Sequence, residues 1–108
     1  MSNDLKFYIN GEWINSDSNE LIDVINPANE EIIGQITAGT IEDINSAVDA
    51  ASEAFRSFSK SSKKERIDLL KNIIKEYENR YKDLAEVITK EMGAPQWLSD
   101  RAQANTGL

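Results

Sequence analysis

The chain contains no cysteine and no histidine among its 108 residues. Without cysteine it can form no disulfide, thiolate nucleophile or zinc–thiolate site, and without histidine it lacks the commonest general base and transition-metal ligand. Its five glycines are too scattered to form a phosphate-binding loop, and no apolar run reaches the length of a signal peptide or a membrane span. The sequence therefore predicts that this chain by itself runs no covalent or cofactor-dependent reaction.

Basic residues are also scarce, since 12 Lys and Arg face 19 Asp and Glu, for a net charge of -7. Phosphate contacts need a basic face, so we expect no nucleic-acid partner. A hydrophobic content of 40% without low-complexity tracts separates the chain from a disordered acidic tail. The length allows one domain at most. We expect a soluble, cytoplasmic chain with no membrane partner.

The first third of the sequence is typical of two β-hairpins. Asn10-Gly11 suits a two-residue type I′ turn because both positions accept a positive φ. Pro27, which cannot donate to a strand ladder, lies between the β-rich runs 21–25 and 31–36. Hairpins are marginal alone and need a helix or further strands to cover them.

The remainder is typical of amphipathic helices. Thr40 with Asp43, and Ser62 with Glu65, are spaced as capping boxes at two helix starts. One apolar stripe follows each predicted helix, and Gly93 with Pro95 ends the second. The stripe residues are Ile41, Ile44, Val48, Ala51, Phe55 and Phe58 in the first helix, and Ile67, Leu70, Ile73, Ile74, Tyr77, Tyr81, Leu84, Ile88 and Met92 in the second. A third helix is expected to start near residues 95–99.

The second helix is predicted to run unbroken over residues 63–92, about 45 Å at 1.5 Å per residue. A compact domain of this length has a radius of gyration of only ~13 Å. The helix would overhang any globule that this chain can build. We therefore expect an incomplete domain, the N-terminal part of a larger α/β protein (α+β as an isolated fragment), with hairpins in 1–39 and helices in 40–108.

Several polar or aromatic groups are candidate sites. The acids of the second helix are better explained as a solvated face than as a catalytic carboxylate pair. The basic residues at 60, 63, 64 and 66 are better explained as an exposed helix start than as an anion site. Core packing is favoured over a binding surface for Trp13 and Trp97.

Glu91 is a less simple case because an acid is disfavoured in the last turn of a helix. A bound cation or a neighbouring base would offset that cost. Plain solvation is favoured from the residues alone, and the cation remains the alternative.

An ordered set of short segments closely resembles the start of the NAD(P)-dependent aldehyde dehydrogenases, and it covers the chain after Lys6. The segments include Phe7-Tyr8-Ile9-Asn10-Gly11-Glu12-Trp13, Val24-Ile25-Asn26-Pro27-Ala28, Ala47-Val48, Glu65-Arg66 and Glu91-Met92-Gly93. The resemblance implies hairpins and helices that pack around the dinucleotide-binding domain of a larger Rossmann-like fold. It also implies a parent enzyme, a homo-oligomer, that oxidises aldehydes with NAD or NADP.

The catalytic cysteine, the base and the cofactor-phosphate elements of that family all follow position 108 in its pattern. No catalytic or cofactor-binding residue is therefore carried over to this chain, and no cofactor is expected to bind it. The resemblance does imply a monovalent cation, Na⁺ or K⁺, held by main-chain oxygens of Val24 and Ile25 and by Glu91.

Two hypotheses follow, and they predict different behaviour. If the chain is an inactive aldehyde dehydrogenase segment, its partner is the remainder of that chain, and alone it should be associated or molten. If it is a free-standing structural or interaction module that reuses the scaffold, it should unfold cooperatively as a discrete species.

Overall fold

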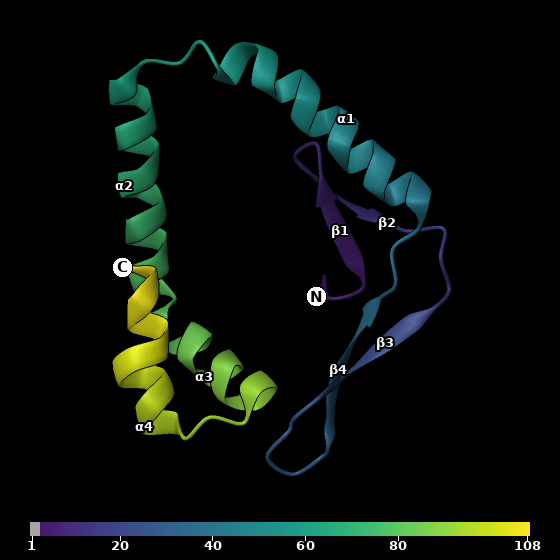
Figure 1. Ribbon diagram of the computed structural model, residues 1–108, viewed down its shortest axis with the longest axis vertical. Coiled ribbons are helices and arrows are strands. Elements are labelled where there is room, and N and C mark those ends of the chain that lie inside the picture. Colours follow the sequence, from purple (N-terminus) through teal and green to yellow (C-terminus); the bar gives the residue numbers. More distant parts are fainter. Residues whose placement is uncertain (1–2) are drawn as a thin grey trace. The chain divides into compact units, whose positions relative to one another are not determined.

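The computed structural model describes residues 3–108 and shows strands followed by helices (Figure 1). The described elements, in chain order, are β1 (Lys6–Ile9), β2 (Glu12–Asn15), β3 (Leu21–Ile25), β4 (Ile32–Thr37), α1 (Ile41–Phe58), α2 (Lys63–Asn79), α3 (Tyr81–Met92) and α4 (Gln96–Leu98). A π-helical turn over Ser99–Gln103 and a 3₁₀ turn over Ala104–Gly107 continue α4. The predicted class, hairpins followed by helices, is confirmed.

These elements form two compact units that interleave in sequence. Of the described residues, the first unit holds those up to 24 and 34–61, and the second holds 25–33 and 62–108. The strands form separate two-stranded sheets, β1 with β2 and β3 with β4. The second hairpin therefore has its base in the first unit and its tip in the second.

The first hairpin has the predicted turn. β1 and β2 pair antiparallel with Ile9 opposite Glu12, and Asn10 and Gly11 between them have φ values of 53° and 83°. Positive φ at both positions is what a type I′ turn requires. Tyr8 and Trp13 are paired across the strands, with ring centroids 5.2 Å apart.

The second hairpin closes through a six-residue loop that begins at Asn26. The Asn26 N–H donates to the Glu31 carbonyl at 2.9 Å, and the Ala28 N–H donates to Asn26 Oδ1 at 2.9 Å. Pro27 fits the second position of this turn because its ring pre-sets φ. Glu30 takes a left-handed φ of 62° to turn the chain into β4.

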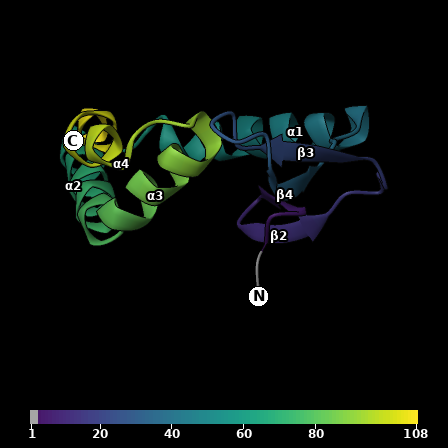
Figure 2. The ribbon, with the colours of Figure 1, turned by 90° about the horizontal axis from the view of Figure 1, so that it is seen from below.

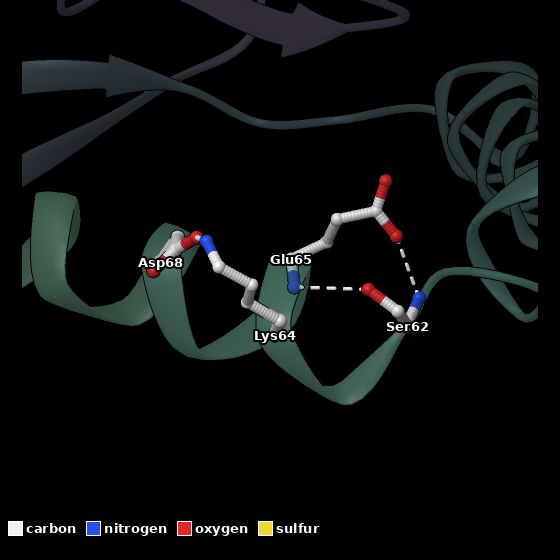
Figure 3. Close-up of polar contacts among 4 residues, drawn as sticks. All are labelled: Ser62, Lys64, Glu65 and Asp68. Atoms are coloured by element: carbon white, nitrogen blue, oxygen red, sulfur yellow. Dashed lines mark hydrogen bonds and ion pairs between the residues drawn. The ribbon is translucent and has the colours of Figure 1, made fainter.

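Both predicted helix starts are confirmed as capping boxes. Thr40 caps α1, with its side chain accepting from the Asp43 N–H at 3.1 Å. Ser62 caps α2 in the same way, accepting from the Glu65 N–H at 3.2 Å (Figure 3). Each cap satisfies N–H groups that have no partner within the helix, and loss of such a cap costs about 1 kcal/mol.

The prediction of one continuous helix over 63–92 is wrong. The helix breaks at Arg80, which has φ −106° and ψ 13° and separates α2 from α3. The Arg80 N–H is shared between the carbonyls of Glu76, at 3.1 Å, and Tyr77, at 3.2 Å. Neither proline nor glycine marks this point, and only the low helix propensity of Asn79 gives a local reason.

Both halves of the broken helix pack against the C-terminal segment within the second unit. Figures 1 and 2 show the C-terminal segment 96–107 beside α3 and close to the end of α2, and hydrogen bonds join it to both helices. Small side chains make the close approach possible, since Ala85, Ser99 and Ala104 are fully buried. Thr89 Oγ1 donates to Ser99 Oγ at 2.8 Å.

The apolar stripes are present but largely uncovered. On α1, Ile41 is 72% exposed and Phe55 is 66% exposed. Trp13 and Trp97, predicted to pack in a core, are 52% and 63% exposed, so that prediction is wrong for this chain. The length argument for a missing partner fails with the helix break, but the uncovered faces require apolar surface that residues 3–108 do not supply.

Candidate functional site

Ionisable side chains do not converge on a catalytic or metal-binding centre in the part of the chain that the structure describes. No group of three or more His, Cys, Asp and Glu side chains there could hold a metal ion. None of the helices described over residues 3–108 is both long and apolar enough to cross a membrane. The candidate sites are therefore the start of α2, the end of α3 and the start of α1.

The start of α2, weighed as an anion site, is occupied by its own side chains. Besides the Ser62 cap, the Ser62 N–H donates to Glu65 Oε2 at 2.6 Å, and Lys64 Nζ pairs with Asp68 at 2.6 Å (Figure 3). The Ser62 bonds hold the pKa of the Glu65 carboxyl below its ordinary value. Because Ser62 caps the Glu65 N–H and Asp68 pairs with Lys64, an exposed helix start explains this cluster.

The end of α3 lies against the turn that follows Ile25. Gly93 closes α3 in the left-handed conformation, with φ 67°. A Cβ added to Gly93 would lie 3.0 Å from the Ala28 nitrogen and 3.0 Å from Pro27 Cγ. Glu91, two residues before Gly93, is exposed, and its carboxylate makes no hydrogen bond or ion pair with residues 3–108. Ile25 belongs to this same unit, whereas Val24 belongs to the other.

The start of α1 is joined to the β2–β3 connection through Asp43. Its Oδ2 accepts hydrogen bonds from Ser16 Oγ at 2.5 Å, the Thr40 N–H at 2.9 Å and Thr40 Oγ1 at 3.0 Å. The Ser16 hydroxyl, followed by the Thr40 N–H, holds the pKa of Asp43 below its ordinary value. The sequence predicted the Thr40 contact but not Ser16, which lies 27 residues away.

We expect acid to weaken this junction, because a carboxyl with a lowered folded pKa stabilises the fold above its unfolded pKa. That contribution is lost as Asp43 is protonated below about pH 4. Asp43→Asn should therefore flatten the acid limb of the unfolding free energy measured against pH. Asp49→Asn, on the same helix, should leave that limb unchanged, and equal slopes for all three proteins would contradict the assignment.

Two tyrosines that the sequence placed on an apolar stripe also act through their hydroxyls. Tyr77 donates to the Ala104 carbonyl at 2.8 Å, and Tyr81 donates to the Asp100 carbonyl at 2.5 Å. Their rings lie 6.5 Å apart, edge to face. Their spacing of four residues was visible in the sequence, but the partner carbonyls could not be predicted without the third helix in place.

The described chain thus carries docking faces, caps and turns, and no reactive group that they position. The model of the aldehyde dehydrogenase family matches residues 13–106. The chain belongs to the aldehyde dehydrogenase family. The match covers the hairpins and helices together, so family membership rests on the whole described arrangement and not on one motif.

Relatives within the aldehyde dehydrogenase family are much longer than this chain. A family member from Staphylococcus epidermidis is 53% identical over all 108 residues, which are 23% of its length. The aldehyde dehydrogenase of Bartonella henselae superimposes with a TM-score of 0.94 at 38% identity, over 99% of this chain and 22% of that one. Aldehyde dehydrogenase C of Pseudomonas syringae, solved with NAD⁺ and octanal, superimposes at 0.92 with 34% identity, over 95% and 21%.

The chain therefore spans less than a quarter of the length of these relatives. The predicted resemblance, to a segment of a longer aldehyde dehydrogenase, is confirmed. The fold of that segment, hairpins followed by helices within a larger Rossmann-like protein, is confirmed as well.

Proposed function

We propose that this chain is the scaffold segment of an enzyme that oxidises aldehydes to carboxylic acids with NAD or NADP. The single observation that carries the proposal is the family match over residues 13–106, in a chain that spans 23% of a close relative. The NAD⁺ complex of the Pseudomonas syringae protein supports a nicotinamide cofactor for the parent.

In this proposal the chain supplies positioning surface and none of the chemistry. The family resemblance implies a cysteine thiolate that adds to the aldehyde carbonyl, and this sequence has no cysteine. It also has no glycine-rich phosphate loop, so its residues do not fit a dinucleotide. The exposed stripes of α1 and α2 would pack against the remainder of the enzyme. The cytoplasmic location and the homo-oligomeric state stay predictions.

A chimaera tests the scaffold role directly. The corresponding segment of the Staphylococcus epidermidis relative would be replaced by this chain, and aldehyde-dependent reduction of NAD⁺ and NADP⁺ would be measured. We expect the chimaera to retain the activity of the relative and the chain alone to have none. The free-standing module would be favoured by two results together: a soluble chimaera that is inactive while the relative is active, and an isolated chain that melts cooperatively.

We also propose that Val24 and Ile25 main-chain oxygens and the Glu91 carboxylate hold Na⁺ or K⁺ in the complete enzyme. Support comes from the close approach of the Pro27–Ala28 turn to Gly93, which brings the segment after Ile25 to the end of α3. Carboxylate and carbonyl oxygens are the ligands that hard cations prefer. A cation there would also offset the cost of an acid at a helix C-terminus.

The cation proposal predicts a salt-specific stability difference. In the chimaera, Na⁺ or K⁺ should raise the melting temperature more than an equal concentration of a bulky organic cation. Glu91→Ala should remove that specific difference, whereas Glu86→Ala, an exposed acid of the same helix, should keep it. Identical salt responses in all three proteins would count against the site.

A further inference from the structure

We propose that Asn10 is a site of spontaneous deamidation in the folded chain, through a cyclic imide formed with the main-chain nitrogen of Gly11. Both residues are exposed at the tip of the first hairpin, outside the paired strands. Within residues 3–108, no hydrogen bond engages the Asn10 carboxamide or the Gly11 N–H. The reacting groups are therefore adjacent, solvated and not held by other partners.

The reaction needs no group beyond these two residues and water. The Gly11 nitrogen attacks Cγ of Asn10, a nitrogen–carbon bond forms, and the side-chain amide leaves as ammonia with the proton from the Gly11 nitrogen. Water then opens either carbonyl of the imide, which gives aspartate or isoaspartate at position 10. No oxidation or reduction occurs in either step.

Glycine in the next position favours this attack. Gly11 has no Cβ to shield its nitrogen, and a Cβ built there would meet no atom within 4 Å, so the approach is open. Its backbone also reaches conformations that other residues avoid. Ser16, which follows the exposed Asn15 of β2, lacks both properties.

The turn must open briefly for the nitrogen to reach Cγ, and the first hairpin is suited to such opening. Its strands have four residues each and form an isolated two-stranded sheet. Two-stranded hairpins are marginally stable in water, and segments with few buried contacts open locally at low cost. Tyr8 and Trp13, whose rings pair across the strands, are both largely exposed.

Two other loop asparagines, Asn26 and Asn29, are held by hydrogen bonds of their own side chains. Asn26 precedes a proline, which has no N–H, and its Oδ1 already accepts from the Ala28 N–H. Asn29 Oδ1 accepts from the Glu31 N–H at 3.2 Å, and its amide donates to Glu31 at 2.8 Å. Asn45 and Asn72 lie inside helices, where main-chain nitrogens are bonded.

The two products should affect the hairpin differently. Aspartate at position 10 keeps an Asp-Gly pair, which also suits a type I′ turn, and adds one negative charge. Isoaspartate inserts one more carbon into the main chain, so a two-residue loop no longer joins Ile9 to Glu12 in register. Because a register shift moves side chains to the opposite face, the Tyr8–Trp13 pair should be lost.

The test is incubation of the chain at mildly alkaline pH, followed by peptide mapping that resolves asparagine, aspartate and isoaspartate at each site. We expect Asn10 to convert several-fold faster than Asn15, and Gly11→Ala to slow Asn10 without changing Asn15. A parallel incubation in denaturant separates the effect of the turn from that of the sequence.

Conversion of Asn10 at the rate of Asn15 would overturn the proposal. Fast conversion of Asn10 in denaturant but not in the folded chain would also overturn it, because the folded turn would then protect Asn10. Gly11→Ala is strained at φ 83° and could open the hairpin. Asn10→Asp provides the second variant: it should retain the near-ultraviolet dichroism of the Tyr8–Trp13 pair, whereas purified isoaspartyl chain should lose it.

Discussion

Replacing Gly93 by alanine is expected to destabilise the second unit by roughly 2–5 kcal/mol, the sum of two effects. A left-handed backbone costs an alanine about 1–2 kcal/mol, and Gly93 has φ 67°. The new Cβ would also lie 3.0 Å from the main-chain nitrogen of Ala28. Main chain cannot move aside as a side-chain tip can, so overpacking adds about 1–3 kcal/mol.

Two other glycines provide matched controls for this experiment. Gly11 also has a positive φ, but a Cβ added there would have no neighbour within 4 Å. The free-energy cost of Gly11→Ala therefore measures the backbone strain without a steric clash. Gly34→Ala has neither feature and, within β4, is expected to stabilise the chain by about 0.5–1 kcal/mol. Denaturant unfolding followed by circular dichroism measures all three. A cost for Gly93→Ala no larger than that for Gly11→Ala would contradict the close approach of the turn.

Replacing Gly107 by alanine is expected to release the C-terminal segment from α2. The added Cβ would overlap the Tyr77 hydroxyl and Cζ and lie 2.7 Å from Cε2. The ring can move only by giving up its hydrogen bond to the carbonyl of Ala104, a fully buried residue. We expect a loss of about 1–3 kcal/mol from overpacking, with about 1 kcal/mol more from the unsatisfied carbonyl.

A double-mutant cycle isolates this contact. In a Tyr77→Leu background the clash is removed, so Gly107→Ala should cost much less there than in the unmodified chain. Faster amide exchange over residues 99–107 should accompany the single Gly107→Ala change. An equal cost in both backgrounds would show that Gly107 acts through its own backbone and not through the tyrosine ring.

Local rules were sufficient to predict much of the fold. Asn10-Gly11 predicted the first turn because a type I′ turn needs a positive φ at both central residues, and these two residues accept it. The backbone twist of that turn matches the twist of the flanking strands. Thr40 and Ser62 predicted two helix starts because each is followed, three residues later, by an acid. The hydroxyl oxygen accepts from the N–H of that acid, and the carboxylate accepts from the N–H of the capping residue. Gly93 predicted a helix end because glycine readily takes the left-handed conformation that closes a helix. Each of these features depends on residues within four positions of one another.

The features that the sequence did not reveal are those that depend on distant partners. Arg80 breaks a helix without proline or glycine, and the helices on both sides of it contact residues about 20 positions later. Ser16 reaches Asp43 across 27 positions. The place of Glu91 in the last helical turn raised the cation alternative, but Val24 and Ile25 as its further ligands came from family resemblance alone.

The interleaving of the two units constrains how the chain can be divided and how it can form. A protease that cut the connector after Ser61 would leave the loop 25–33, which belongs to the second unit, on the opposite fragment. The C-terminal product would then lack part of the second unit, whereas the N-terminal product would contain the whole first unit together with that loop. Gly93 contacts Pro27 and Ala28, which lie about 65 positions earlier in the chain. Because so long a loop must close before this contact forms, loop closure should limit the rate at which the second unit folds.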